Sequence, residues 1–408
     1  MQLAHATIGD RMDKKLTSTQ ARVIAATTMR LAGIIVAFTI SVSAGPRADC
    51  GTPPDLKDGW RIATLESVGL SSATLCSMVK FIDESKQNNV HAVLVIRHGQ
   101  LVFEQYFTGS DYHLGQPVGE VKFGPEVKHD DRSITKSITA LVLGVAIDRG
   151  WIKNLDQPVM SFFPQYADLR TADRNRITLA YLLTMSSGLE WHEFGVPYTS
   201  KANSEIAMDT SADPYRYALE QKVVAPPGQV WNYSSGSAEL IAAVLKKATG
   251  KPLDQLAHEV LFEPLGIADV EWYKYAQGNV SAAAGLRLRP RDLAKIGQLM
   301  LQQGTWNGKQ IVPASWIRSA TSPHMQAIEL YFYGYQFWLG RSLFDQRELI
   351  WSSAIGNGGE RMFIVPELDL VMVMNAGLYD SSLQGSLPIE IFNSYVLRAI
   401  ETQRQWSR

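Results

Sequence analysis

One stretch in the first half of the chain constrains the fold most. Residues 131–150 read Asp-Arg-Ser-Ile-Thr-Lys-Ser-Ile-Thr-Ala-Leu-Val-Leu-Gly-Val-Ala-Ile-Asp-Arg-Gly. Beyond the lysine, apolar side chains nearly encircle the helix axis, and helices of this kind lie inside a core. Asp131 suits the first turn and Gly150 suits the C-terminal cap, so both ends are marked. The sequence therefore predicts one buried helix here.

Ser133 and Lys136 lie at the head of this helix. Residues three apart are neighbours on a helix surface, so the hydroxyl and the amine can meet. A lysine with so little polar surface around it is expected to be desolvated, which favours the neutral amine that accepts a proton from serine. The helix N-terminus adds partial positive charge that suits a developing anion. Ser133 is therefore a candidate nucleophile, and a buried capping serine is the alternative interpretation.

The same Ser-x-x-Lys spacing occurs a second time, at Ser77 and Lys80. Residues 70–85 are expected to form an amphipathic helix whose apolar stripe excludes both side chains. We therefore expect this second copy to be a surface pair. The spacing alone does not identify a catalytic serine.

The composition is that of an ordinary globular protein with a distinct leader. The chain has 408 residues, a hydrophobic fraction of 46% and a net charge of −1, which suits one large domain or two lobes. No basic stripe, phosphate-binding loop or zinc-finger spacing suggests nucleic acid or nucleotide as a partner. Residues 1–48 contain a short apolar run behind Arg30 that ends in small residues, a secretory signal pattern, with Met29 as a possible true start. We expect a periplasmic or secreted protein with no stable membrane insertion once the signal is removed.

The chain has two cysteines, Cys50 and Cys76. Export would permit a disulfide between them, and two unpaired thiols fit the sequence equally well. With two cysteines and no histidines clustered along the chain, a metal site is not predicted. No cofactor is expected either.

Strand patterns lie toward both ends of the chain, with helical patterns between them. Residues 92–97 and 101–107 are predicted to form a hairpin, and four more strands are expected within 335–374. Residues 108–130 are expected to be irregular, and 189–215 form an aperiodic segment of a length that is usually functional or mobile. Further helices are predicted at 154–163, 177–185, 237–248, 252–262, 289–303, 313–320 and 388–401.

This order of elements predicts an α+β fold. Residues 51–130 and 285–408 would together form an antiparallel sheet flanked by helices. Residues 131–284 would form a mainly helical lobe inserted into it. The two lobes would make one catalytic domain overall.

A tyrosine and a glycine-rich stretch complete the candidate site. Tyr233 lies on a turn before a predicted helix, where its hydroxyl can project into a cleft, and a nearby ammonium would lower its pKa so that it could act as a base or relay a proton. Residues 354–360 read Ala-Ile-Gly-Asn-Gly-Gly-Glu, and their glycines would let a substrate approach the backbone and free an N–H for a carbonyl oxygen. A packed tyrosine and a simple hairpin turn are the alternatives.

Taken in order, these motifs resemble the serine β-lactamase and penicillin-binding protein superfamily. The resemblance is greatest to the branch with class C-like esterases, D-amino-acid peptidases and 6-aminohexanoate-dimer (nylon oligomer) hydrolases. Ser133-Ile134-Thr135-Lys136 matches the family's Ser-x-x-Lys motif, and Tyr233-Ser234-Ser235 lies where the family carries Tyr-x-Asn. The resemblance covers about residues 60–400, including the runs at 182–189 and 281–286.

Two departures from the family pattern bear on the substrate. Ser235 stands where lactamases typically have asparagine, and the family's Lys-Thr-Gly motif is absent near residues 354–356. Both departures argue against efficient β-lactam turnover and against cell-wall carboxypeptidase activity. They favour a less charged ester or amide.

The resemblance implies a serine hydrolase that forms an acyl-enzyme. Ser133 would attack the carbonyl, with Lys136 and Tyr233 sharing its proton, and Ser235 would support Lys136 by hydrogen bonding. Backbone N–H groups of Ser133 and of the glycine-rich stretch would hold the oxyanion. The remaining candidate contacts for a small ester or amide substrate are Gly356, Asn357, Gly358 and Tyr198.

Other functions stay open from the sequence. A β-lactamase or D-alanyl-D-alanine peptidase is the alternative enzyme, and a non-catalytic member that binds peptidoglycan or a partner protein is the alternative of another class. The intact motifs speak against a pure binding role, which would not need all three catalytic side chains. His129, Glu190 and Asp209 are expected to be solvated, and no oligomeric state is predicted.

Overall fold

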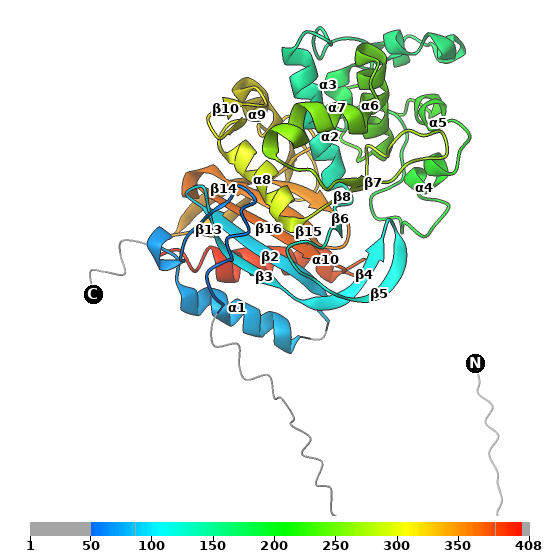
Figure 1. Ribbon diagram of the computed structural model, residues 1–408. Coiled ribbons are helices and arrows are strands. Elements are labelled where there is room, and N and C mark those ends of the chain that lie inside the picture. Colours follow the sequence, from blue (N-terminus) through cyan, green and yellow to red (C-terminus); the bar gives the residue numbers. More distant parts are fainter. Residues whose placement is uncertain (1–49, 86, 380, 402–408) are drawn as a thin grey trace, which may run out of the picture. The chain divides into compact units, whose positions relative to one another are not determined.

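The computed structural model describes residues 50–85, 87–379 and 381–401, so the predicted leader lies outside the described residues. Across these residues the main sheet has nine strands, in the order β1-β3-β2-β16-β15-β14-β13-β12-β11 (Figure 1). In that order the strands are β1 (Arg61–Ile62), β3 (Gln100–Tyr106), β2 (Val90–Arg97), β16 (Leu370–Ala376), β15 (Glu360–Val365), β14 (Arg347–Gly356), β13 (Trp338–Phe344), β12 (Phe332–Tyr333) and β11 (Met325–Gln326).

The centre of the sheet joins the two ends of the chain. Strand β2 pairs antiparallel with β16, with Arg97 opposite Leu370. Strands β2 and β16 are buried on both faces, as expected for central strands covered on both sides. The predicted α+β fold, with an antiparallel sheet completed by distant segments, is confirmed. The short edge strand β1, which runs parallel to β3, was not predicted.

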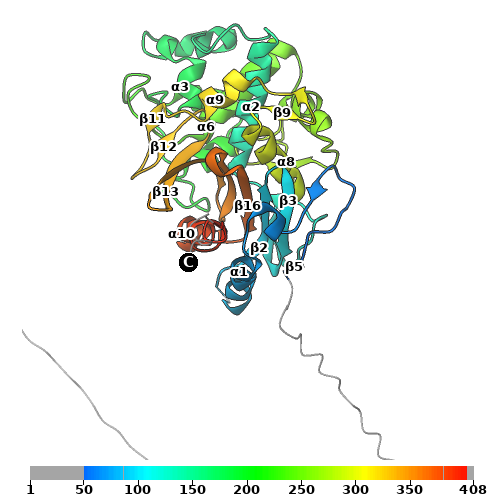
Figure 2. The same cartoon turned by 90° about the vertical axis from the view of Figure 1, so that its left-hand side faces the viewer.

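Helices cover both faces of the sheet (Figure 2). On one face α1 (Ser72–Glu84) and α10 (Leu383–Ile391), followed by a π-helical turn at Phe392–Val396, enclose an apolar core. On the other face α8 (Pro290–Leu301) packs against β2, β15 and β16. Ser77 and Lys80 lie on the solvent side of α1, where the Lys80 side chain is 74% exposed. The prediction that this second Ser-x-x-Lys is a surface pair is confirmed.

The predicted serine helix is α2 (Ile134–Asp148), which packs against α6 (Ser235–Thr249), α7 (Leu253–Ala257) and α9 (Ala314–Ala320). Every residue from 134 to 146 is buried, as the apolar periodicity indicated. Gly144 allows helix α9 to approach closely, because a Cβ there would lie 2.4 Å from the Trp316 ring. The other helices of this region are α3 (Leu179–Leu183), α4 (Ser204–Asp209) and α5 (Pro214–Glu220). The predicted lobe boundaries near residues 130 and 285 stay predictions.

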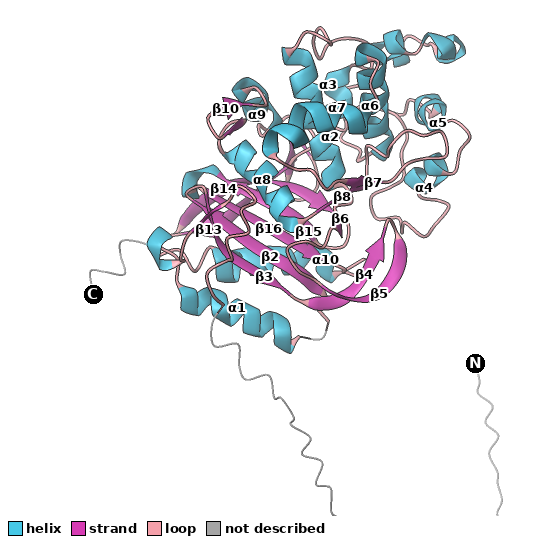
Figure 3. Ribbon diagram, viewed as in Figure 1, coloured by secondary structure: helices cyan, strands magenta, loops and turns pink. Residues whose placement is uncertain are grey.

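Residues 108–130 differ most from expectation (Figure 3). They form a hairpin of β4 (Thr108–His113) and β5 (Gln116–Lys122), followed by β6 (His129–Asp130). Strand β6 joins β8 (Leu286–Leu288) and β7 (Glu271–Trp272) in a small sheet. The sequence signal was missing because β5 is almost entirely exposed and carries no apolar alternation.

Several predicted boundaries also shift. The predicted helix at 154–163 is a pair of 3-10 segments, Val159–Phe162 and Pro164–Leu169. The helix predicted at 252–262 continues from α7 into a π-helical turn at His258–Phe262. The last helix begins earlier than predicted and contains Pro388.

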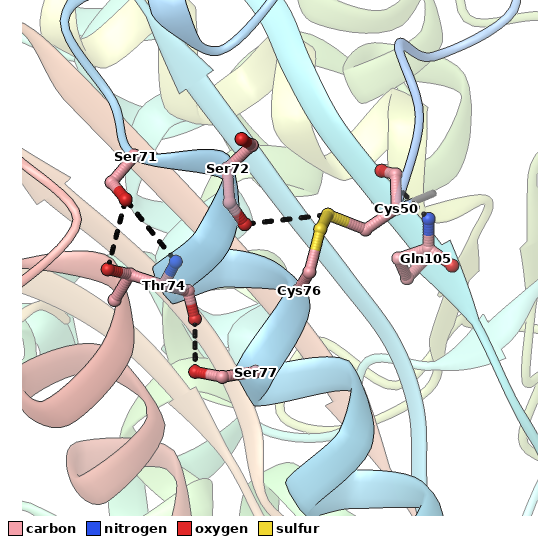
Figure 4. Close-up of a disulfide and its surroundings, with 7 residues drawn as sticks. All are labelled: Cys50, Ser71, Ser72, Thr74, Cys76, Ser77 and Gln105. Carbon is pink, nitrogen blue, oxygen red and sulfur yellow. Dashed lines mark hydrogen bonds between the residues drawn. A yellow bond between two sulfur atoms is a disulfide. The ribbon is translucent and has the colours of Figure 1, made fainter. Parts of the chain in front are cut away.

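The structure joins Cys50 and Cys76 in a disulfide (Figure 4). Cys76 belongs to α1, and Gln105 on β3 donates a hydrogen bond from Nε2 to the carbonyl oxygen of Cys50 at 3.2 Å. The start of the described chain is therefore held against both a helix and the sheet edge. Among the described helices, none is long and apolar enough to cross a bilayer.

Candidate active site

Ser133 and Lys136 meet at the start of α2. The Lys136 Nζ atom lies 2.9 Å from the Ser133 Oγ atom and also donates to the carbonyl oxygen of Ala283 at 3.0 Å. Lys136 is only 1% exposed. Ser133 occupies the N-cap position, but its side chain makes no capping hydrogen bond. The hydroxyl is therefore paired with the amine, as the nucleophile interpretation requires.

The backbone entering α2 is unusual. Arg132 has a φ of 49°, in the left-handed region that non-glycine residues adopt at an energetic cost and that often occurs at functional sites. Its guanidinium lies 4.6 Å from the centre of the Tyr379 ring. A Cβ on Gly356 would lie 2.6 Å from the carbonyl oxygen of Asp131. The end of β14 therefore approaches the segment that leads into Ser133.

Tyr233 packs beside Lys136, whose Nζ lies 5.0 Å from the centre of the tyrosine ring. Burial raises the pKa of the Tyr233 phenol well above its usual value, the negative charge of Glu193 raises it further, and a hydrogen-bonding contact with Ser133 opposes the rise. The predicted fall in the pKa of Tyr233 is therefore wrong in direction. Loss of hydration outweighs the opposing contact with Ser133, and the phenol keeps its proton.

Glu193 is the residue that sequence reasoning missed. Its Oε2 atom accepts hydrogen bonds from the Ser235 backbone N–H and from Trp191 Nε1, both at 2.7 Å. Its Oε1 atom accepts from the Ser235 hydroxyl at 2.8 Å and from the Tyr198 hydroxyl at 3.1 Å. Ser235 thus bonds to Glu193, and the predicted hydrogen bond from Ser235 to Lys136 is not among the contacts of the described residues. In the sequence, nothing separates Glu193 from the half-exposed Glu190 three positions earlier.

A cavity of about 440 Å³ opens over Ser133. One wall comes from the tip of the β4–β5 hairpin and another from residues 198–209. Lys136, Tyr233 and Ser235 are buried and are not part of its lining. The lining residues closest to the chemistry are Tyr112, Arg132, Ser133, Tyr198, Glu205, Asn357 and Tyr379.

The glycine-rich stretch contributes unequally to this cavity. Asn357 lines it. Gly356 is buried at the end of β14. The Gly358 N–H donates to Gln384 Oε1 at 2.9 Å, so this N–H is already engaged outside the cavity. Of the three predicted contacts in this stretch, Gly356, Asn357 and Gly358, Asn357 is the one that lines the cavity.

Three titratable side chains near the cavity are buried or half-buried. Asp209 is half-buried and accepts a hydrogen bond from the Tyr275 hydroxyl at 3.0 Å, and burial raises its pKa to about 6. Glu205 is buried, and loss of hydration together with the negative charge of Glu193 raises its pKa well above the usual value. His129 is only 1% exposed, on β6. The prediction that His129 and Asp209 are solvated is therefore wrong.

Glu239 on α6 holds the loop that receives Lys136. Its Oε1 atom accepts from the backbone N–H groups of Ala282 at 2.7 Å and Ala283 at 3.1 Å. Burial raises the pKa of this carboxyl from 4.5 to about 7. The folded state binds this proton more tightly than the unfolded state does. The protonated Glu239 carboxyl therefore contributes its full stabilisation of the folded protein below pH 4.5, and this contribution is lost as the pH rises through 7.

Replacing Glu239 by glutamine should therefore remove one source of pH-dependent stability. As the pH rises from about 4 to about 8, the unmodified protein should lose about 3 kcal/mol of unfolding free energy relative to the Glu239→Gln variant. Urea denaturation of both proteins across this range measures the difference. The exposed Glu84→Gln variant should run parallel to the unmodified protein, and a pH-independent difference for Glu239→Gln would contradict the raised pKa.

Comparison with known proteins identifies the family of the chain. The chain matches the Beta-lactamase family over residues 79–377. It is 24% identical over 246 residues to the 6-aminohexanoate-dimer hydrolase of Paenarthrobacter ureafaciens, covering 56% of each chain. It is 27% identical over 186 residues to esterase EstB of Burkholderia gladioli, covering 43% of this chain and 45% of the esterase. The matched region spans about half the length of these curated relatives.

The fold is shared with solved structures as well. The octameric penicillin-binding protein homologue from Pyrococcus abyssi superposes with a TM-score of 0.59 at 20% identity, over 79% of this chain and 78% of that chain. The names of the curated relatives are those of hydrolases. Because the family match covers most of the described residues, the chain belongs to the beta-lactamase family.

Proposed function

We propose that this protein is a serine hydrolase that cleaves an ester or amide bond through an acyl-enzyme on Ser133. The observation that carries the proposal is the 2.9 Å contact between Ser133 Oγ and the buried Lys136 Nζ at the floor of the cavity. An activated serine needs a base within hydrogen-bond reach, and this contact supplies one. The hydrolase names of the relatives support the same reaction class.

In the first step Ser133 Oγ attacks the carbonyl carbon while Lys136, as the amine, takes the hydroxyl proton. The carbonyl oxygen of Ala283 accepts one N–H of Lys136 and so orients the nitrogen lone pair toward Ser133. The carbonyl π electrons move to the substrate oxygen. The Ser133 N–H and a backbone N–H near Asn357 hold the resulting oxyanion, and losing one such donor typically costs about 100- to 1,000-fold in rate.

Tyr233 then supplies a proton to the leaving group. A phenol whose pKa is raised by burial is protonated in the resting enzyme, so it can act as an acid when the carbon–oxygen or carbon–nitrogen bond breaks. The proton on Lys136 restores the phenol. In the second half-reaction water attacks the acyl carbon, and the Lys136–Tyr233 pair takes a proton from the water. The bond between the acyl carbon and Ser133 Oγ then breaks, the pair returns that proton to Oγ, and the acid product leaves.

The cavity favours a substrate without a strongly held carboxylate. The Arg132 guanidinium, which lines the cavity, is already engaged: it stacks on the Tyr379 ring and lies 3.7 Å from Asp130. The acidic side chains of Glu205 and Asp209 also line the space. This lining, with the absent Lys-Thr-Gly motif, supports an ester or uncharged amide over a β-lactam or a D-alanyl-D-alanine peptide. The leader pattern and the Cys50–Cys76 disulfide support export to the periplasm or medium.

Fluorophosphonate labelling tests the proposal. We expect one label on the folded protein, located on Ser133 by peptide mapping, lost in Ser133→Ala and kept in Ser77→Ala. A short-chain p-nitrophenyl ester should be hydrolysed much faster than a chromogenic cephalosporin. Absence of label on folded protein would overturn the hydrolase proposal and favour a binding role. Faster turnover of the cephalosporin would instead assign a β-lactamase.

A further inference from the structure

Two histidines and an aspartate from three different strands meet next to the segment that leads into α2. They are His91 on β2, Asp111 on β4 and His129 on β6, and their exposed fractions are 0%, 3% and 1%. One donor atom from each lies within 4.8 Å of the other two. His91 Nδ1 is 2.6 Å from His129 Nε2, and Asp111 Oδ1 is 3.5 Å from His129 Nε2 and 4.0 Å from His91 Nδ1.

The outer nitrogen of each imidazole faces an acceptor. His91 Nε2 lies 3.2 Å from Asn89 Oδ1, and the Asn89 amide is oriented by its Nδ2 donating to two backbone carbonyls. His129 Nδ1 lies 3.3 Å from the carbonyl oxygen of Asp130 and 3.4 Å from Glu360 Oε1. We assign the hydrogen of each imidazole to its outer nitrogen, because that nitrogen faces an oxygen acceptor. In the neutral imidazoles, this leaves the two inner nitrogens with lone pairs.

Three electron-pair donors thus converge with no hydrogen between them. The two inner nitrogens face each other, and Asp111 Oδ1 is buried and accepts no hydrogen bond. Facing lone pairs and an unpartnered carboxylate oxygen are costly in a buried site unless a cation lies among them.

The surroundings match those of a metal site. Metal-binding histidines usually donate their second N–H to a carbonyl or carboxylate, as both do here. Phe123 stacks on the His91 ring at 4.0 Å and covers it. A Cβ on Gly109 would lie 2.8 Å from His91 Nε2, so glycine at this position makes room for the imidazole and its partner Asn89. Zinc–ligand bonds of about 2.0–2.1 Å place tetrahedral ligands about 3.3 Å apart. The 3.5 Å between Asp111 Oδ1 and His129 Nε2 is close to this spacing, whereas the two imidazole nitrogens, at 2.6 Å, would move apart on binding the ion.

We propose that His91, Asp111 and His129 form a buried binding site for Zn²⁺ or a chemically similar transition-metal cation. Two imidazole nitrogens and one carboxylate oxygen are the donor set that such ions prefer, whereas Mg²⁺ and Ca²⁺ prefer oxygen alone. The site could not be predicted from sequence spacing, because His91 and His129 are 38 residues apart. The proposal is independent of the reaction at Ser133.

The site would stabilise one side of the substrate cavity. Tyr112 and Asp130 line the cavity. They directly follow the proposed ligands Asp111 and His129 in the chain. A bound metal would therefore join β2, β4 and β6 and hold the backbone that leads to Ser133. It would not contact the substrate, since none of the three ligands lines the cavity. Its role is structural.

Metal binding to the full-length folded protein tests the proposal. After chelator treatment and removal of the chelator, the protein should take up about one Zn²⁺ or Co²⁺ per chain, measured by elemental analysis. Bound Co²⁺ should give the intense visible absorption of low-coordinate cobalt. Zn²⁺ should raise Tm, whereas Mg²⁺ and Ca²⁺ should leave it unchanged.

Two variants locate the bound ion. Asp111→Asn should weaken Co²⁺ binding by about 100-fold or more. His98→Gln is the matched control, because His98 and Asp369 form an exposed pair at 2.9 Å, and its binding should not change. Uptake below about one-tenth of an ion per chain by the unmodified protein, or unchanged binding in Asp111→Asn, would overturn the site. Failure of the unmodified protein to take up metal would mean that the two histidines share a proton instead.

Discussion

Replacing Lys136 by methionine is expected to lower kcat/KM for a p-nitrophenyl ester by about 1,000- to 10,000-fold. Methionine keeps an unbranched side chain in a position that is 1% exposed, but it cannot accept the proton of Ser133. The carbonyl oxygen of Ala283 would lose its 3.0 Å donor, which costs about 1–3 kcal/mol of stability. The protein should therefore stay folded while the first chemical step slows.

The second Ser-x-x-Lys of the same chain is the natural control. Lys80→Met alters an exposed lysine at the same spacing from a serine, and we expect full activity from it. Steady-state kinetics with circular dichroism separate lost chemistry from lost structure. Activity within tenfold of the unmodified enzyme in folded Lys136→Met would show that another group takes the proton.

Removing the Glu193 side chain should be the most damaging single change behind the active site. In Glu193→Ala four hydrogen-bond donors lose their acceptor: two from Ser235, one from Trp191 and one from Tyr198. Because four buried donors would be left without an acceptor, we expect the unfolding free energy to fall by about 3–5 kcal/mol. Urea denaturation measures the loss.

Glutamine at the same position separates charge from hydrogen bonding. The amide oxygen of Glu193→Gln can accept from the two N–H groups, and its NH₂ can donate to the two hydroxyls, which can turn to accept. Stability should then change by about 1 kcal/mol or less. Losing the negative charge should lower the pKa of Tyr233, which Glu193 raises, so the alkaline limb of the kcat/KM profile should move to lower pH.

The half-exposed Glu190→Gln serves as the control for this pair of variants. Its carboxylate contacts His192 at 3.3 Å near the surface. We expect neither its stability nor its pH profile to change appreciably. Equal destabilisation by Glu193→Ala and Glu193→Gln would mean that the charge itself, rather than the four hydrogen bonds, holds this network.

Local pattern was enough to predict the parts of the site that lie on regular elements. The apolar periodicity of α2 located Ser133 and Lys136 on one buried helix, and the structure places their side chains in contact. Helical spacing fixes the geometry of Ser133 and Lys136 within a few residues, so that prediction needed no knowledge of the tertiary structure. The prediction of Tyr233 rested instead on the family resemblance, and its ring centre lies 5.0 Å from Lys136 Nζ.

Local sequence patterns could not predict burial or contacts between residues that are distant in the sequence. The pKa of Tyr233 moves opposite to expectation because its loss of hydration depends on aromatic neighbours such as Trp338, far away in sequence. The role of Glu193 depends on a contact across 42 residues. The β4–β5 hairpin escaped notice because a solvated ribbon needs no apolar alternation. Each failure concerns what a side chain packs against.

The pairing of β2 with β16 has a consequence for biosynthesis. The two strands are joined only when residues 370–376 have emerged from the ribosome or crossed a membrane. Until then β2, with apolar residues buried on both of its faces in the finished protein, presents an unpaired edge that can associate with other chains. A nascent or truncated chain that ends within the helical region would therefore be prone to aggregate and dependent on chaperones, whatever the stability of the completed enzyme.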